Sequence, residues 1–208
     1  MGCTLTATEP RRVHSMKSEP VSSNAIHTTI LEEVKQMKKP EKIKERTSSV
    51  LDNRIPLSSR QKFQIVKSWK GIERNIKTTG INMFLRLFEA NDEIMQLFVF
   101  IGGYKTVTEL RESESLVGHV TMVMHTIDEA ITSLDDSEYV INMLQSIGKS
   151  HKTRLKDFDP NQFWKIEDPF LLAVKETLGD RYTSNMENIY NLTIRFILET
   201  LIEGFNLG

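Results

Sequence analysis

The chain has 208 residues, and its 27 basic residues nearly balance 28 acidic ones, so the formal net charge is −1. This balance argues against a general nucleic-acid binder, and the short, interrupted apolar runs argue against a bilayer-spanning segment or a secretory signal. The single cysteine, Cys3, cannot form an intrachain disulfide and is typical of a reducing, cytosolic setting.

The chain begins with Met1-Gly-Cys-Thr-Leu-Thr6, which fits the pattern for N-myristoylation. Removal of Met1 would expose Gly2, and Thr6 supplies the hydroxyl residue of the pattern. Cys3 lies where a second acyl chain is commonly attached, and two chains hold a membrane far more firmly than one. The start therefore predicts acylation at Gly2 and Cys3 and a position on the cytoplasmic face of a membrane. The alternative is an ordinary polar start with an accidental match.

Residues 1–50 are polar and rich in serine and threonine, and we expect them to form a flexible tether. From residue 4 to residue 50, nine basic residues outnumber six acidic ones, so this segment carries +3 and the remainder carries −4. The positive charges gather between Lys35 and Arg46, where they would favour an anionic lipid surface by about 1 kcal/mol per charge. A solvated run of charges without a lipid partner is equally consistent with this composition.

The folded domain is expected to span residues 57–208 and to begin with a helix at Ser58 or Ser59. A serine hydroxyl there can accept a hydrogen bond from an otherwise unpaired N–H of the first turn. Apolar residues recur along this helix at three-residue steps and predict one buried stripe: Phe63, Val66, Trp69 and either Ile72 or Glu73.

A second helix is predicted from about residue 74 to residue 90, and a short third helix is predicted after Asn91. Gly80 lacks a side chain and therefore permits another helix to approach the second one closely. Asn91 can cap the third helix, and the acidic pair that follows is favoured in a first turn by the helix dipole. Residues 104–112 show no clear period and are expected to form a connection.

Two later helices each place one histidine on an apolar face. One is expected from Ser113 to Leu134 and carries His119, with Val123 one turn later on the same side. The other is expected over residues 139–151, and its face combines an apolar stripe with a terminal histidine: Val140, Leu144, Ile147 and His151.

A neutral imidazole at the edge of an apolar stripe is well placed to bind a metal ion. Two helices that each present one histidine can hold a flat apolar disc with iron at its centre, and haem is such a disc. The alternative for His119 and His151 is a hydrogen-bonded core residue, which is the commoner role of a lone histidine. His125 lies six positions after His119 and points to another side, where we expect it to be structural or exposed.

The last helices complete an all-α chain. Asp159-Pro160 is a strong start signal, because proline fixes φ at the first helical position. Pro169 should kink or split the helix that follows, and Gly179 should end it. A final helix is expected from about Ser184 to Phe205. No segment is a convincing strand, so the sequence predicts about seven or eight helices in one domain.

This pattern resembles the globin family over residues 57–205. Within the family it is similar to neuroglobin and to globin X, whose tails also begin with acylation signals. The matching positions follow the family's order and spacing: Trp69, the run Phe84-Leu-Arg-Leu-Phe88, Phe98, His119 with Val123, Ile147 with His151, and Asp159-Pro-Asn-Gln-Phe163. Two departures stand out, because Asp92 replaces the proline that usually starts the short third helix, and Met122 replaces the basic residue that often faces a haem propionate.

The resemblance implies a globin fold that holds haem b. His151 would be the proximal iron ligand and His119 the distal histidine, and the resting haem would have both on its iron. Phe98 matches the phenylalanine that packs against the haem, and Phe84 matches the bulky distal residue. The cofactor-binding set is then expected to be Phe84, Phe98, His119, Val123, Leu144, Ile147 and His151.

The function implied by the resemblance is reversible binding of O₂ and other diatomic gases. A membrane tether opposes the high concentration and free diffusion that O₂ transport needs, which favours sensing or redox work with a reductase partner, or nitrite and NO chemistry as a side activity. From another class, an acylated helical adaptor that binds proteins without haem stays open. A calcium sensor lacks its D-x-D-x-D-G loop here, and a hydrolase lacks its nucleophile elbow.

Overall fold

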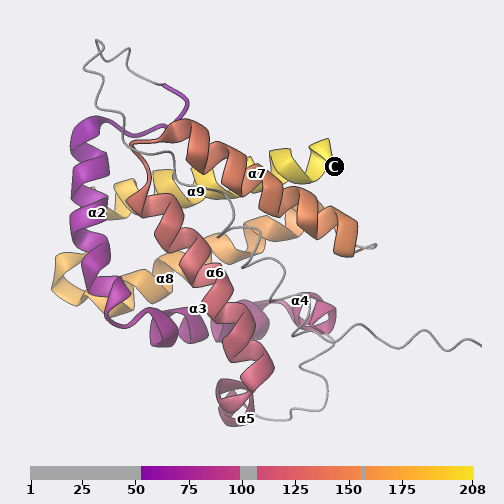
Figure 1. Ribbon diagram of the computed structural model, residues 1–208. Coiled ribbons are helices and arrows are strands. Elements are labelled where there is room, and N and C mark those ends of the chain that lie inside the picture. Colours follow the sequence, from indigo (N-terminus) through magenta and orange to yellow (C-terminus); the bar gives the residue numbers. More distant parts are fainter. Residues whose placement is uncertain (1–52, 99–106, 156–157) are drawn as a thin grey trace, which may run out of the picture.

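The computed structural model describes residues 53–98, 107–155 and 158–208, so the predicted tether with Gly2 and Cys3 lies outside the described residues (Figure 1). The described chain forms eight α-helices and two 3₁₀-helices without a β-strand, which confirms the all-α prediction. In chain order they are α2 (Ser59–Glu73), α3 (Ile76–Ala90), α4 (Asp92–Leu97), α5 (Val107–Glu112), α6 (Glu114–Thr132), α7 (Ser137–Arg154), η2 (Pro160–Ile166), α8 (Glu167–Leu178), η3 (Gly179–Arg181) and α9 (Ser184–Leu207).

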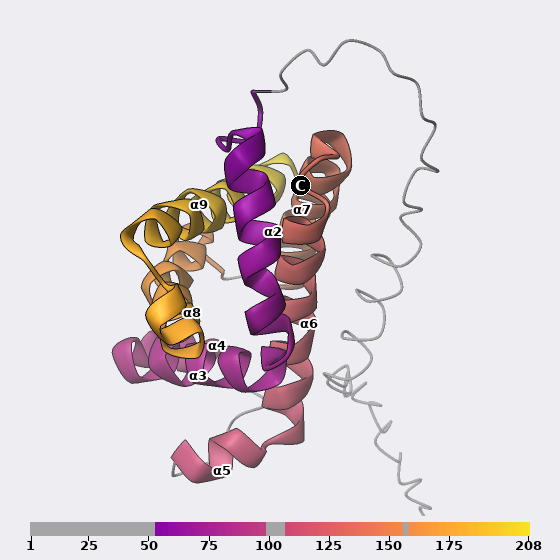
Figure 2. The same ribbon diagram turned by 90° about the vertical axis from the view of Figure 1, so that its left-hand side faces the viewer.

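The helices cross one another in pairs instead of lining up as a parallel bundle. α3 crosses behind the lower half of α6, while α9 passes behind α7 (Figure 1). The view turned by 90° shows α2 in front, with α9 on one side of it and α6 and α7 on the other (Figure 2). The contact between α7 and α9 is the most extensive between any two described helices. None of the described helices is long and apolar enough to cross a membrane.

Side-chain caps set several of the helix starts. The Ser58 hydroxyl accepts a hydrogen bond from the Gln61 N–H, and the Gln61 side chain accepts one from the Ser58 N–H, so both form a capping box on α2. Ser113 accepts from the Leu116 N–H at the start of α6. Asp159 accepts from the Asn161 N–H before η2. Each such cap contributes about 1 kcal/mol, and together they explain why these starts were predictable.

Asn91 occupies the N-cap position of α4, as expected, and its carbonyl oxygen is 3.1 Å from the Ile94 nitrogen. Its side chain makes no capping hydrogen bond to α4 and instead donates from Nδ2 to the Leu87 carbonyl, 3.0 Å away. Asn91 is buried, so its amide has to find a partner, and the last turn of α3 offers unpaired carbonyls. Asn91 therefore joins the two helices, because its side chain bonds to the end of α3 and its carbonyl accepts the first hydrogen bonds of α4.

Two further expectations are corrected. The buried residues of α2 are Ile65, Trp69, Gly71 and Ile72, so Trp69 and Ile72 are confirmed, whereas the Phe63 side chain is 69% exposed. Strict three-residue steps rotate around a helix of 3.6 residues per turn and leave its buried face, but alternating steps of four and three stay on it. The expected connection also contains a helix, because residues 107–112 form α5.

The segment after Asp159 is divided as Pro169 suggested. Residues 160–166 form the 3₁₀-helix η2, and α8 then begins at Glu167. Pro169 lies in the first turn of α8, where a backbone N–H has no acceptor within the helix, so its missing donor costs little. Gly179 ends α8 with a φ of +54°, a conformation that favours glycine.

Candidate functional site

His119 lies in the second turn of α6 among aromatic rings from other elements. Its imidazole meets the ring of Phe84 edge-on, with centroids 5.3 Å apart, and the ring of Phe98 edge-on at 5.0 Å. Phe84 comes from α3 and is buried, whereas Phe98 follows the last residue of α4. Phe88 extends the cluster, with its ring centroid 5.1 Å from that of Phe98. The structure thus brings together three of the predicted cofactor-binding residues.

The close packing of α3 on α6 places Phe84 beside His119. A Cβ added at Gly80 of α3 would lie only 2.6 Å from Cγ1 of Val120 on α6, so the absent side chain sets the distance between the helices. This confirms the expectation that Gly80 permits the close approach of another helix. Phe84 follows Gly80 by one turn, so it meets α6 on the same side of α3.

His151 lies in the last turn of α7, and its ring is oriented by its own helix. Nδ1 is 2.8 Å from the Ile147 carbonyl oxygen, one turn earlier. Burial lowers the pKa of the His151 imidazole below its usual value of 6.5, although the hydrogen bond to Ile147 partly opposes this shift. Burial therefore favours the neutral ring, and the tautomer that donates Nδ1–H to this carbonyl keeps the Nε2 lone pair available to a metal ion.

Two phenylalanines that the sequence did not assign to the site contact the His151 ring, and a third packs against both of them. The ring centroid of Phe163 is 5.1 Å from that of His151, and the centroid of Phe158 is 6.1 Å away. Phe205, near the end of α9, contacts both of these rings, at 5.9 Å from Phe158 and 6.4 Å from Phe163. Helical periodicity had marked Phe163 and Phe205 only as residues of apolar faces, and Phe158 lies outside any periodic segment.

The other predicted pocket residues belong to the apolar faces of the two histidine helices. Leu144 and Ile147 of α7 are buried, while Val123 of α6 is partly buried and packs against the core. Met122, which stands where a basic residue often faces a propionate, is 8% exposed. His125 is exposed, which agrees with its expected role outside the site.

A sequence model of the globin family matches residues 81–201. The chain belongs to the globin family. Its cofactor is haem. The matched range includes both histidines and the helices that carry them, α6 and α7.

Several known proteins are similar to this globin. Neuroglobin of Tetraodon nigroviridis is 29% identical over 142 residues, which cover 66% of this chain and 88% of that protein. Cytoglobin-1 of Oryzias latipes is 32% identical over 136 residues, covering 65% of this chain and 74% of that one. These relatives confirm the resemblance to neuroglobin-like globins.

Two solved structures share the fold. A hexacoordinated heme protein from an anhydrobiotic tardigrade superposes with a TM-score of 0.71 at 34% identity, covering 74% of this chain and 99% of that one. The hemoglobin of the botfly Gasterophilus intestinalis superposes with a TM-score of 0.64, covering 72% of this chain and 99% of that chain, and at 12% identity it supports the fold alone.

The side chains of this globin fit haem in their chemistry. His151 is desolvated, and its Nδ1 is engaged by a backbone carbonyl, as expected of a histidine whose Nε2 binds iron. Phe84, Leu144 and Ile147 add buried apolar surface of the kind that a porphyrin requires.

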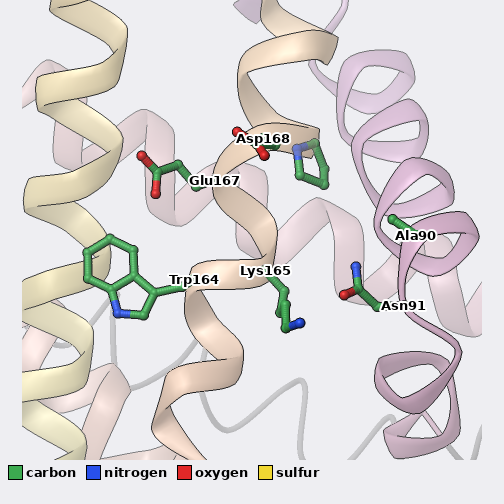
Figure 3. A pocket seen from close by; sticks show the side chains of 7 residues that line it. Ala90, Asn91, Trp164, Lys165, Glu167 and Asp168 are labelled. Carbon is green, nitrogen blue, oxygen red and sulfur yellow. The ribbon is translucent and has the colours of Figure 1, made fainter.

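A groove elsewhere on the molecule contains neither histidine. It has a volume of about 280 Å³ and lies between the end of α3, at Ala90 and Asn91, and the junction of η2 with α8, at residues 164–169 (Figure 3). The side chain of Trp164 points toward α9 and that of Lys165 toward Asn91 (Figure 3). Lys165 is 3.8 Å from Glu93, so its charge has a local partner, and nothing in the groove indicates a ligand.

Proposed function

We propose that this globin holds haem b between α6 and α7, with His151 as the proximal iron ligand. The observation that carries the proposal is the contact of His151 Nδ1 with the Ile147 carbonyl at 2.8 Å inside a desolvated environment. A ring fixed in this way presents Nε2 without rotation about its side-chain bonds. Because burial also disfavours a proton on the ring, the iron would meet little competition from protonation near neutral pH.

His119 is the proposed distal ligand in the resting state. The two edge-on phenylalanines, Phe84 and Phe98, restrict its ring. Similarity to the tardigrade hexacoordinated heme protein, at 34% identity, supports two histidines on the iron. Haem iron supplies the position at which O₂ and other diatomic gases bind reversibly. His119 would move aside to admit such a gas, and its N–H can then donate a hydrogen bond to it.

The apolar walls would keep water from the gas-binding position. Phe84 is 2% exposed and Leu144 is fully buried, so neither has to be desolvated when haem enters. Exclusion of water limits oxidation of the iron during reversible gas binding. These residues therefore support binding of O₂ more than rapid turnover of a polar substrate.

The N-terminal segment would tether this globin to the cytoplasmic face of a membrane. Gly2 and Cys3 are the proposed acylation sites, and the basic residues from Lys35 to Arg46 would add attraction to anionic lipid. A protein confined to a surface cannot carry O₂ by free diffusion. We therefore propose a sensing or redox role, in which a reductase returns the iron to its ferrous state.

Absorption spectra of the purified full-length protein test the haem assignment. Oxidised, reduced and CO-treated samples should all show a strong Soret band. Two histidine ligands predict split visible bands in the reduced sample without gas, whereas one broad band would indicate that His119 is not on the iron. A folded, colourless protein that ignores added haemin would contradict the proposal as a whole.

Metabolic labelling with a myristate analogue tests the tether. Wild-type protein should incorporate the label and partition with membranes, and Gly2→Ala should do neither. Cys3→Ser should keep the label but bind membranes less firmly, because one acyl chain gives only marginal affinity. Equal labelling of wild type and Gly2→Ala would exclude N-myristoylation.

A further inference from the structure

The helix that carries His151 touches α9 backbone to backbone. A Cβ added at Gly148 of α7 would overlap the Leu201 carbonyl oxygen and lie 2.8 Å from the Phe205 nitrogen. A Cβ at Gly204 of α9 would overlap backbone atoms of Gln145 on α7. Because the facing atoms belong to backbones, they cannot rotate away as a flexible side chain would. The two glycines therefore fix how closely α7 and α9 can approach, where α9 passes behind α7 (Figure 1).

Gly148 and Gly204 lie inside helices, where glycine lowers helix stability, and the packing of α7 against α9 must offset this loss. Each glycine destabilises a helix by about 1 kcal/mol relative to alanine. Not every helical glycine in this chain is required by a close contact, since a Cβ at Gly118 of α6 would meet nothing within 4 Å. Gly148 and Gly204 differ because alanine at either position would force the helices apart.

The crossing lies next to the groups that orient His151. Gly148 directly follows Ile147, whose carbonyl oxygen lies 2.8 Å from His151 Nδ1. A shift of α7 away from α9 at this point would move the carbonyl and the imidazole together. The position of the ring therefore depends on the distance between the two helices.

The same stretch of α9 also supplies aromatic support. Phe205 follows Gly204 and is buried, and its ring contacts Phe163, which in turn meets the His151 ring edge-on at 5.1 Å. One short segment of α9 thus touches the histidine helix through its backbone and reaches the histidine ring through one intervening phenylalanine.

We propose that Gly148, Gly204 and Phe205 are positioning residues for His151 that set the strength of its bond to the haem iron. This inference rests on the proposed function, in which His151 is the proximal ligand. None of the three is proposed to touch the iron. They act by fixing where α7 places the imidazole and how its ring is supported.

The test uses full-length holoprotein with Gly148→Ala and Gly204→Ala, each in a His119→Ala background so that only His151 remains as a histidine ligand. The iron–histidine stretching band in the ferrous state should shift, and haem should transfer to an excess of acceptor apoglobin roughly tenfold to a hundredfold faster. Gly118→Ala, on a helix surface with open space, is the matched control and should leave both measurements unchanged. An unshifted band in both crossing variants would overturn the proposal.

A second background separates positioning from general stability. In His151→Gly with added imidazole, the ligand is no longer attached to α7, so Gly148→Ala should not shift the iron–imidazole band. If Gly148→Ala shifts this band as much as it shifts the iron–histidine band in the His119→Ala background, the contact between α7 and α9 acts on the whole pocket. That result would overturn the proposal. If His151→Gly keeps its haem and its spectrum without imidazole, the proposed ligand itself is wrong, which is a distinguishable failure.

Phe205→Leu keeps the test decisive if the alanine variants do not fold. It adds no atom at the crossing and removes only the aromatic support, and circular dichroism should show an intact helical fold. The iron–histidine band should then shift by less than in Gly148→Ala. A folded Phe205→Leu variant with the parent band would overturn the role of α9 in positioning His151.

Discussion

The surroundings of His119 and His151 differ, although both histidines occupy an apolar helix face. His119 is packed by side chains of two other elements, Phe84 of α3 and Phe98 after α4. His151 is oriented by a carbonyl of its own helix, and that helix is in backbone contact with α9. Side-chain packing allows a ring to leave and return, whereas a backbone contact holds it in place. We therefore propose that His151 is the permanent ligand and His119 the displaceable one.

Loss of His151 should have the largest effect. We expect His151→Ala to lose most of its haem on purification, because no other described side chain on α7 offers a comparable imidazole donor. The measurement is the ratio of Soret to protein absorbance, with exposed His125→Ala as the matched control. A full Soret band in His151→Ala would show that His151 is not the permanent ligand and would contradict the contrast between His119 and His151.

Loss of His119 should change gas binding more than haem content. His119→Ala should keep its haem, and its reduced spectrum should change from split visible bands to one broad band. CO should bind faster by on the order of tenfold or more, because a competing ligand no longer occupies the site for most of the time. Stopped-flow mixing with CO measures this, and an unchanged rate would indicate that His119 does not compete for the iron.

Truncation of Phe84, which packs against His119, should lower the stability of the fold. Phe84 is 2% exposed, so Phe84→Ala leaves a cavity and should lower the free energy of unfolding by about 3 kcal/mol. Phe63→Ala is the matched control, because the same substitution at a side chain that is 69% exposed should cost less than about 0.5 kcal/mol. Denaturant unfolding of the CO-bound proteins measures both, and equal losses would contradict the corrected buried face of α2.

Acid should release His151 from iron only below pH 6.5. Because the folded-state pKa lies below the unfolded-state value, the neutral ring contributes stability above pH 6.5, and this contribution is lost as the pH falls through the folded-state value. A Soret titration should therefore keep its band at pH 6.5 and lose it at lower pH. Loss of half the band at or above pH 6.5 would contradict a desolvated proximal histidine.

Much of the fold follows from local sequence signals. The caps at Ser58, Ser113 and Asp159, the break before Pro169 and the stop at Gly179 all depend on residues within a turn of each helix end. The same local periodicity placed both histidines on apolar faces. Periodicity was wrong at Phe63, because a three-residue step leaves the buried face of the helix. The capping signal did not predict that the Asn91 side chain donates to a carbonyl of α3.

By itself, the sequence determined most of the helices, their order, the family and the two candidate ligands, because capping and helical period act between near neighbours in the chain; it missed α5. Only the tertiary structure decided that Gly148 meets the backbone of α9 and that Phe205 supports the rings around His151. These contacts join residues far apart in the sequence. Their distances depend on how two whole helices cross, which no local pattern specifies.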